Sequence, residues 1–337
     1  MSDTTTPPSP SREHRRRAAA DRQRARNAEA PAIPTTVPWR AVAVFAAVSV
    51  GLAWLVQLPV WLSGEGLASP LFTPLTLVMM FTPAVAALVA VRVQRPAAPA
   101  RMLGLVPIRP AWRTFGFAAA MLVALPLISF AALALGQVLG FVEFDFSFAA
   151  LAQLLESQGG QPVPPELLPT LAIVSLIALP VNSLVTSVAT FGEELGWRGW
   201  LLPALRPLGT WPALVLSGAF WGLWHTPVIL LGYNFGVTDA SGVLFMTIAC
   251  VFLGVLLGWT RLRTASVWPA VLAHGAINTA TPLFLVTFLV PEPGSVHGTI
   301  LGVAGWIVLA VVIAVLVLLG QFRKQPQPGL TLAESAE

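Results

Sequence analysis

An apolar run from Leu167 to Ala189 continues into the stretch Thr190-Phe-Gly-Glu-Glu-Leu-Gly-Trp-Arg-Gly-Trp200. The run is long enough to cross a bilayer as a helix, yet two adjacent carboxylates and an arginine follow it directly. A charged side chain at bilayer depth costs roughly 2.5–3.5 kcal/mol on insertion scales, so such charges are usually paired or functional. The stretch therefore predicts a transmembrane helix that ends in polar groups with a definite role.

The spacing of these charges separates the two acids. Glu194 and Arg198 are four residues apart, so on a helix they share a face and can pair. Glu193 points about a quarter-turn away and is left available. An ordinary salt bridge at the membrane surface would explain the pair equally well, so this stretch alone leaves structural and catalytic interpretations open.

The composition places the chain in a membrane. Of its 337 residues, 56% are hydrophobic and 10% are charged, with a mean hydropathy of +0.77, whereas soluble domains are about 25% charged. The apolar runs lack the alternation of a membrane β-barrel. The single cysteine, Cys250, excludes an intramolecular disulfide and a cysteine-based zinc cluster. We predict an all-α, polytopic transmembrane bundle with an internal polar cavity.

About eight transmembrane helices are predicted within a bundle that covers residues 37–322. Their approximate ranges are 40–62, 70–93, 113–140, 168–195, 211–231, 242–260, 267–289 and 299–321. Residues 1–36 and 323–337 are polar and Pro-containing, so we predict a disordered arm and a disordered tail. The arm is arginine-rich. Beside a membrane span, such an arm is more typical of contact with anionic lipid than with nucleic acid.

Positive charge alternates between the connections. Lysine or arginine occurs before span one, between spans two and three, four and five, and six and seven, and after span eight. The other connections contain none, and hold the acids Glu65, Glu143, Asp145, Glu156, Glu166, Asp239 and Glu292. The positive-inside rule then predicts a multi-pass protein of the plasma membrane with both termini in the cytoplasm.

Two histidines lie inside predicted spans. His225 falls in span five, and His274 falls in span seven, four residues before Asn278. Polar side chains are costly in lipid unless they face the bundle interior, and a lone one often serves only as a helix–helix hydrogen-bond partner. Here a carboxylate, two imidazoles and an amide converge, and these groups can activate a water and stabilise an oxyanion.

These motifs resemble the CPBP family, which includes the CAAX prenyl endopeptidases and the Abi and lysostaphin-resistance-protein-A-like proteins. The family pattern is Glu-Glu-x-x-x-Arg, then Phe-x-x-x-His, then His-x-x-x-Asn, each on its own transmembrane helix. Glu193-Glu194-Leu-Gly-Trp-Arg198 and His274-Gly-Ala-Ile-Asn278 keep the first and third motifs, whereas Trp221 replaces the phenylalanine before His225. The resemblance covers about residues 165–285.

The resemblance implies an intramembrane endopeptidase that uses a glutamate-activated water. Glu193 would be the general base, His225 would hold or activate the water, and His274 with Asn278 would stabilise the oxyanion. Its substrate would be a membrane-associated peptide, of the CAAX type or a leader peptide.

The remaining motif residues would support Glu193. Glu194 and Arg198 would form a pair that aims it, and Trp221 would keep an aromatic wall on the site with a changed shape. The family is often labelled metalloprotease-like, and Glu193, His225 and His274 could in principle ligate zinc. No His-Glu-x-x-His motif is present, and the resemblance favours a mechanism without a metal, so no cofactor is assured.

The predicted spans leave a mismatch in depth. Glu193 lies near the cytoplasmic end of span four, so cleavage is expected near that face, whereas His225 lies about 14 residues, roughly 21 Å, into span five. Either span four continues past Trp200, or the Gly209–Pro212 region begins span five lower in the membrane than predicted.

Two other functions remain open. One is a proton-coupled transporter, although paired broken helices are not evident; the other is a non-catalytic scaffold or bacteriocin self-immunity protein.

Overall fold

The computed structural model describes residues 13, 17, 33–106, 111–159, 161–290 and 295–323. The described residues form helices and connections, with one isolated β-bridge between Phe144 and Leu289 and no strands. The predicted all-α membrane bundle is thus confirmed. Most of the predicted arm (1–36) and tail (323–337) lies outside the described residues.

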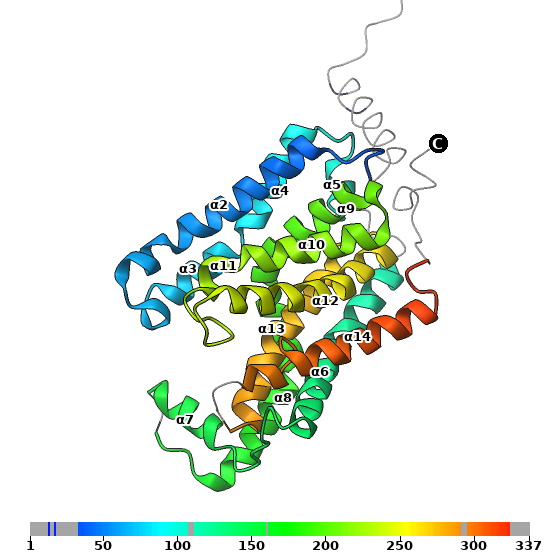
Figure 1. Cartoon of the computed structure of the whole chain (residues 1–337). Helices are drawn as coiled ribbons and strands as arrows, with labels where there is room; N and C mark the ends of the chain where they lie inside the picture. Colours follow the sequence, from blue (N-terminus) through cyan, green and yellow to red (C-terminus); the bar gives the residue numbers. More distant parts are fainter. Residues whose placement is uncertain are drawn as a thin grey trace, which may run out of the picture.

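Seven helical stretches in the described part of the chain are long and apolar enough to span a bilayer. They are α2 (Trp39–Ser63), α3 with α4 (Phe72–Met79 and Thr82–Gln94), α6 (Ala111–Val138), α8 (Leu168–Glu194) with its continuation, α12 (Ala240–Thr264), α13 (Trp268–Phe288) and the stretch ending in α14 (Val303–Leu318). The shorter helices α5 (Pro99–Met102) and α7 (Ala149–Ser157) lie in connections. Figure 1 shows α5 and α9 (Leu202–Leu205) at the end of the bundle opposite to α7.

The predicted span 211–231 is interrupted, which explains why seven rather than eight long stretches are found. Helix α10 (Thr210–Trp224) has 15 residues and is followed by the short α11 (Thr226–Ile229). Pro227 has no amide hydrogen, and its ring would clash with the carbonyl of Leu223 in a continuous helix. The Thr226 hydroxyl donates to that carbonyl instead. The break places His225 at the end of α10.

Helix α8 does not stop at its charged end. It continues as a π-helical turn at Leu195–Leu201 and then as α9 (Leu202–Leu205), so the first explanation of the depth mismatch is correct. The chain reverses at Gly209, and Glu193 and His225 each lie 16 residues from it in sequence. The two side chains therefore reach the same depth on antiparallel segments.

Helices α10 and α12 pack closely through glycines, side by side in Figure 1. A Cβ atom on Gly222 would lie 2.4 Å from the Cα atom of Thr247, and one on Gly218 would lie 2.7 Å from the Cα atom of Val251. Small residues allow this backbone approach between membrane helices. The contact fixes the orientation of α10, which carries Trp221 and leads into His225.

Gly222→Val is expected to destabilise the protein by roughly 1–3 kcal/mol, because the new side chain must push α12 away. The midpoint of thermal unfolding in detergent should fall. Gly51→Val in α2 is the matched control, because a Cβ there has no neighbour within 4 Å. Equal stability of the two variants would contradict the close α10–α12 contact.

Candidate active site

A cavity of about 1190 Å³ lies among α3, α8, α10, α12 and α13. Its lining includes all four side chains predicted to be catalytic: Glu193, His225, His274 and Asn278, together with Trp221. Glu194 and Arg198 lie behind this lining and are almost completely buried. The fold therefore brings together residues from three helices that are far apart in the sequence.

One oxygen of Glu193 is held by an indole. The Trp221 Nε1–H group donates to Glu193 Oε2 at 2.7 Å, and the carboxylate is 3% exposed. Among the described residues, Glu193 Oε1 has no hydrogen-bond partner, although Glu193 lines the cavity. The carboxylate is thus oriented at one oxygen and open at the other. The sequence predicted Trp221 only as an aromatic wall of the site. Its hydrogen bond to Glu193 could have been anticipated, because tryptophan has an indole N–H donor that the phenylalanine of the family motif lacks.

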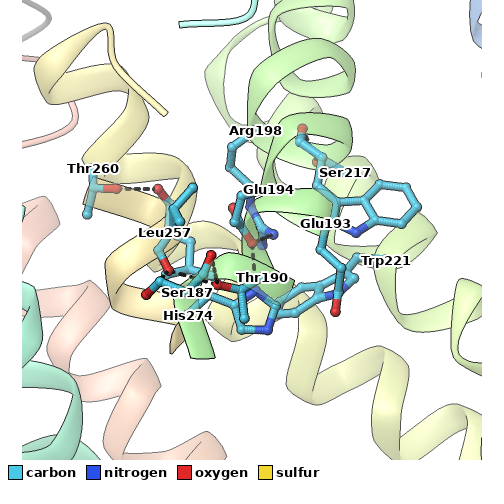
Figure 2. Close-up of polar contacts among 12 residues, drawn as sticks. Ser187, Thr190, Glu193, Glu194, Arg198, Ser217, Trp221, Leu257, Thr260 and His274 are labelled. Carbon is cyan, nitrogen blue, oxygen red and sulfur yellow. Dashed lines mark hydrogen bonds and ion pairs between the residues drawn. The ribbon is translucent and has the colours of Figure 1, made fainter. Parts of the chain in front are cut away.

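Glu194 joins an arginine and a histidine in a buried cluster, shown in Figure 2. Its Oε1 atom accepts hydrogen bonds from Arg198 Nη1 at 2.7 Å and from His274 Nδ1 at 3.0 Å. The Arg198 guanidinium also lies 4.3 Å from the centre of the Trp221 ring, in a cation–π contact. The pairing of Glu194 with Arg198 agrees with the sequence spacing, whereas its bond to His274 was not predicted.

His225 is oriented by the backbone of its own helix. Its Nδ1 atom lies 2.9 Å from the carbonyl oxygen of Trp221. A carbonyl can only accept, so Nδ1 carries the proton, and in the neutral ring Nε2 is then an acceptor. Because His225 and Glu193 line the same cavity, this acceptor can hold a water molecule there.

His274 and Asn278 lie one turn apart on α13. His274 Nδ1–H donates to Glu194, which leaves Nε2 without a partner among the described residues. Asn278 is exposed to the cavity, and its amide has no hydrogen-bond partner in the described part of the chain. Helix α13 is held against α8 by the Thr190 hydroxyl, which donates to the carbonyl of Val271 at 3.0 Å. The two side chains are therefore available on a fixed helix face.

Arg261 supports the site from behind, which the sequence analysis missed because it counted this residue as a loop charge. Its Nε–H donates to the carbonyl of Arg198 at 3.1 Å, and Nη2–H donates to the carbonyl of Met102 at 2.7 Å. The side chain is 1% exposed. Arg261 thereby ties α12 to the π-helical turn and to the last residue of α5.

The donor set does not fit the zinc site considered from sequence. No three histidine, cysteine, aspartate or glutamate side chains in the described ranges are grouped so that they could share a metal ion. Glu193 uses one oxygen for Trp221, and His274 uses its Nδ1 atom for Glu194. We therefore derive no step through a metal.

Two comparisons with known proteins concern this region. Residues 170–280 match the family model described as Type II CAAX prenyl endopeptidase Rce1-like. A curated protein of Methanococcus maripaludis, "CAAX prenyl protease 2", is 33% identical over 116 residues, which cover 32% of this chain and 42% of the relative. The chain thus matches less than half of that relative's length. Both matches confirm, over this central segment, the resemblance to the CPBP family of CAAX prenyl endopeptidases that the three motifs predicted.

Proposed function

We propose that this membrane protein is an intramembrane endopeptidase that hydrolyses a peptide bond of a membrane-associated substrate with a water activated by Glu193. The observation that carries the proposal is how the two oxygens of the Glu193 carboxylate are placed. One oxygen is fixed by Trp221 at 2.7 Å, while the residue lines a cavity with two imidazoles and an amide. A general base needs such orientation with one oxygen free.

In the proposed reaction, a water lies between Glu193 Oε1 and His225 Nε2. Glu193 takes a proton from the water, and the oxygen attacks the carbonyl carbon of the peptide bond. The carbon–nitrogen bond then breaks, and the proton passes from Glu193 to the leaving amine. The products are a carboxylic acid and an amine, which can then exchange a proton to give carboxylate and ammonium, so atoms and charge balance without a further reactant.

The oxyanion would be stabilised by Asn278 and His274. The Asn278 amide can donate directly, whereas His274 can donate from Nε2 only when its ring is protonated. Donors fixed in a water-poor site stabilise developing charge strongly.

The proposal is tested by incubating the purified chain in liposomes with peptides and identifying new termini by mass spectrometry. One peptide ends in a prenylated CAAX sequence, and the second is its unmodified counterpart. Cleavage of either peptide supports the endopeptidase. Absence of cleavage, with proton flux that depends on a solute, would instead support the transporter, and absence of both would support the scaffold.

Trp221→Phe is expected to reduce kcat/KM by about 10–100-fold, because a hydrogen bond to a charged group contributes roughly 1.5–3 kcal/mol. The loss should fall on kcat, since the aromatic surface remains. It would occur although phenylalanine is the residue of the family motif. Trp224→Phe is the matched control, because the indole of Trp224 donates to the neutral Thr82 hydroxyl at 3.0 Å. Equal activity of Trp221→Phe and the unchanged chain would contradict the positioning role.

A further inference from the structure

Among the described residues, the lining of the cavity that contains Glu193 reaches the connections at one end of the bundle and none at the other end. We infer that the substrate reaches this site from the non-cytoplasmic face of the membrane, between α3 and α8. The substrate is then a membrane-anchored polypeptide exposed on that face, and this inference rests on the proposed endopeptidase function. It differs from the expectation, drawn from the position of Glu193 in the sequence, that cleavage takes place near the cytoplasmic face.

The charge pattern fixes which side is which. The connections at 64–71, 139–167, 230–239 and 289–302 contain acids but no lysine or arginine. The opposite connections hold all the arginines that lie between the helices. Arginine- and lysine-rich connections stay in the cytoplasm, so the four acidic connections lie outside.

The mouth of the cavity is built from these outer connections. Its lining includes Thr73 at the start of α3, Tyr233 and Gly236 in the connection after α11, and Val296 and Thr299 before α14. In the described part of the chain, no residue from a cytoplasmic connection lines the cavity. A polypeptide outside the membrane would therefore meet the opening directly.

Packed side chains close the cytoplasmic side. Every residue of the π-helical turn Leu195–Leu201 is buried, and Trp197 and Trp200 are 0% exposed. Phe45 of α2 packs on both rings, with centroid distances of 5.4 and 5.0 Å. A Cβ atom on Gly196 would lie 2.4 Å from Pro83 Cβ. Among the described residues, this packing closes the layer unless α8 separates from α2 and α4.

The depth of Glu193 also favours the outer side. Its neighbour Gly192 lies against the break between α3 and α4, where an added Cβ would be 2.6 Å from the carbonyl oxygen of Met80. At 1.5 Å per residue, Met80 is about 12 Å from the outer end at Phe72 and about 21 Å from the cytoplasmic end at Gln94. The outer path to the carboxylate is thus the shorter one.

The cavity also opens sideways toward lipid. Leu77, Phe81, Val185 and Val188 line it, yet they are 51%, 40%, 69% and 68% exposed. These side chains lie on α3, at the turn into α4, and on α8, on the outer side of Glu193. An apolar segment of the substrate could remain in the outer leaflet while its polar backbone enters at Thr73 and Tyr233.

The inference is tested by labelling single cysteines with a charged, membrane-impermeant maleimide. In a Cys250→Ser background, Thr73→Cys and Thr76→Cys report on the cavity, Ser157→Cys marks the outer face, and Ala100→Cys marks the cytoplasmic face. Intact cells expose the outer face, and inside-out vesicles expose the cytoplasmic one. We expect Thr73→Cys and Thr76→Cys to react at least about tenfold faster in intact cells, as Ser157→Cys does, because the bilayer excludes the charged reagent. Faster reaction in inside-out vesicles, as for Ala100→Cys, would overturn the inference.

A second readout separates this inference from the proposed function. Attachment of a bulky impermeant maleimide to Thr73→Cys from outside should reduce peptide cleavage by at least about tenfold through occlusion of the mouth, while the same modification of Ser157→Cys should leave cleavage unchanged. Full cleavage after complete modification of Thr73→Cys would overturn the inferred route. Labelling from outside in a chain that cleaves no peptide would support the access route and contradict the endopeptidase proposal alone.

Discussion

Glu193→Gln is expected to lower kcat/KM for peptide cleavage by about 10²–10⁴-fold, the usual contribution of a general base. The amide keeps the size of the carboxylate, and its oxygen can still accept the hydrogen bond from Trp221 Nε1, which spans 2.7 Å in the unchanged chain. What the variant loses is the ability to take a proton from the water. The loss should therefore appear in kcat with little change in KM.

The measurement is a steady-state assay in liposomes at equal protein density, with folding checked by thermal unfolding. His297→Gln is a suitable control, because His297 is not among the cavity-lining residues and packs against Phe141 and Phe245. Cleavage by Glu193→Gln at the rate of the unchanged chain would mean that another group activates the water.

Glu194→Ala is expected to destabilise the protein by about 3–5 kcal/mol, because it leaves a buried cation without its partner. Arg198 is 1% exposed, and its shortest ionic contact is the 2.7 Å bond to Glu194. His274 would lose its orienting acceptor at the same time. Thermal unfolding in detergent should show a marked fall in the midpoint, and peptide cleavage should be lost.

A double variant separates stability from activity. Glu194→Gln with Arg198→Met removes both charges while keeping similar volumes, so most of the stability should return. Cleavage should stay low, because Arg198→Met removes the cation–π contact by which Arg198 holds Trp221, the indole that orients Glu193. Recovery of full cleavage by the double variant would show that the Glu194–Arg198 pair serves packing alone.

Much of this arrangement could be predicted from local patterns. Apolar runs of sufficient length predict membrane helices, and seven of the eight predicted segments contain stretches able to span a bilayer. The four-residue spacing of Glu194 and Arg198 predicted a shared face, and the two residues are paired. The order of the three motifs predicted that Glu193, His225, His274 and Asn278 line a common interior, which the cavity lining agrees with.

Other features depend on tertiary contacts that spacing does not encode. Whether α8 stops at Glu194 or continues through a π-helical turn depends on packing against Pro83 and Phe45, far away in the sequence. The burial of Arg261 depends on carbonyls supplied by Arg198 and Met102. Pro227 indicated the interruption of the helix at His225. However, Pro180 and Pro282 occur inside continuous helices, so a proline alone does not predict where a helix is interrupted.

The length of the helical segment that carries Glu193 differs most from expectation. Sequence position placed Glu193 near the end of span four, since that span was taken to finish at residue 195. The continuation to Leu208 instead puts further buried layers between this carboxylate and the end of the bundle that carries α9. Which face of the membrane the cavity meets stays a prediction.

The most direct test of the central claim is an experimental structure of the Glu193→Gln variant in lipid with an uncleaved substrate peptide bound. The carbonyl carbon of the scissile bond should lie about 3–3.5 Å from a water that is held between the residue 193 side chain and His225. Its carbonyl oxygen should lie within hydrogen-bond distance of Asn278. A peptide bound away from this cavity, or residues 193, 225, 274 and 278 lying on separate surfaces, would contradict the central claim.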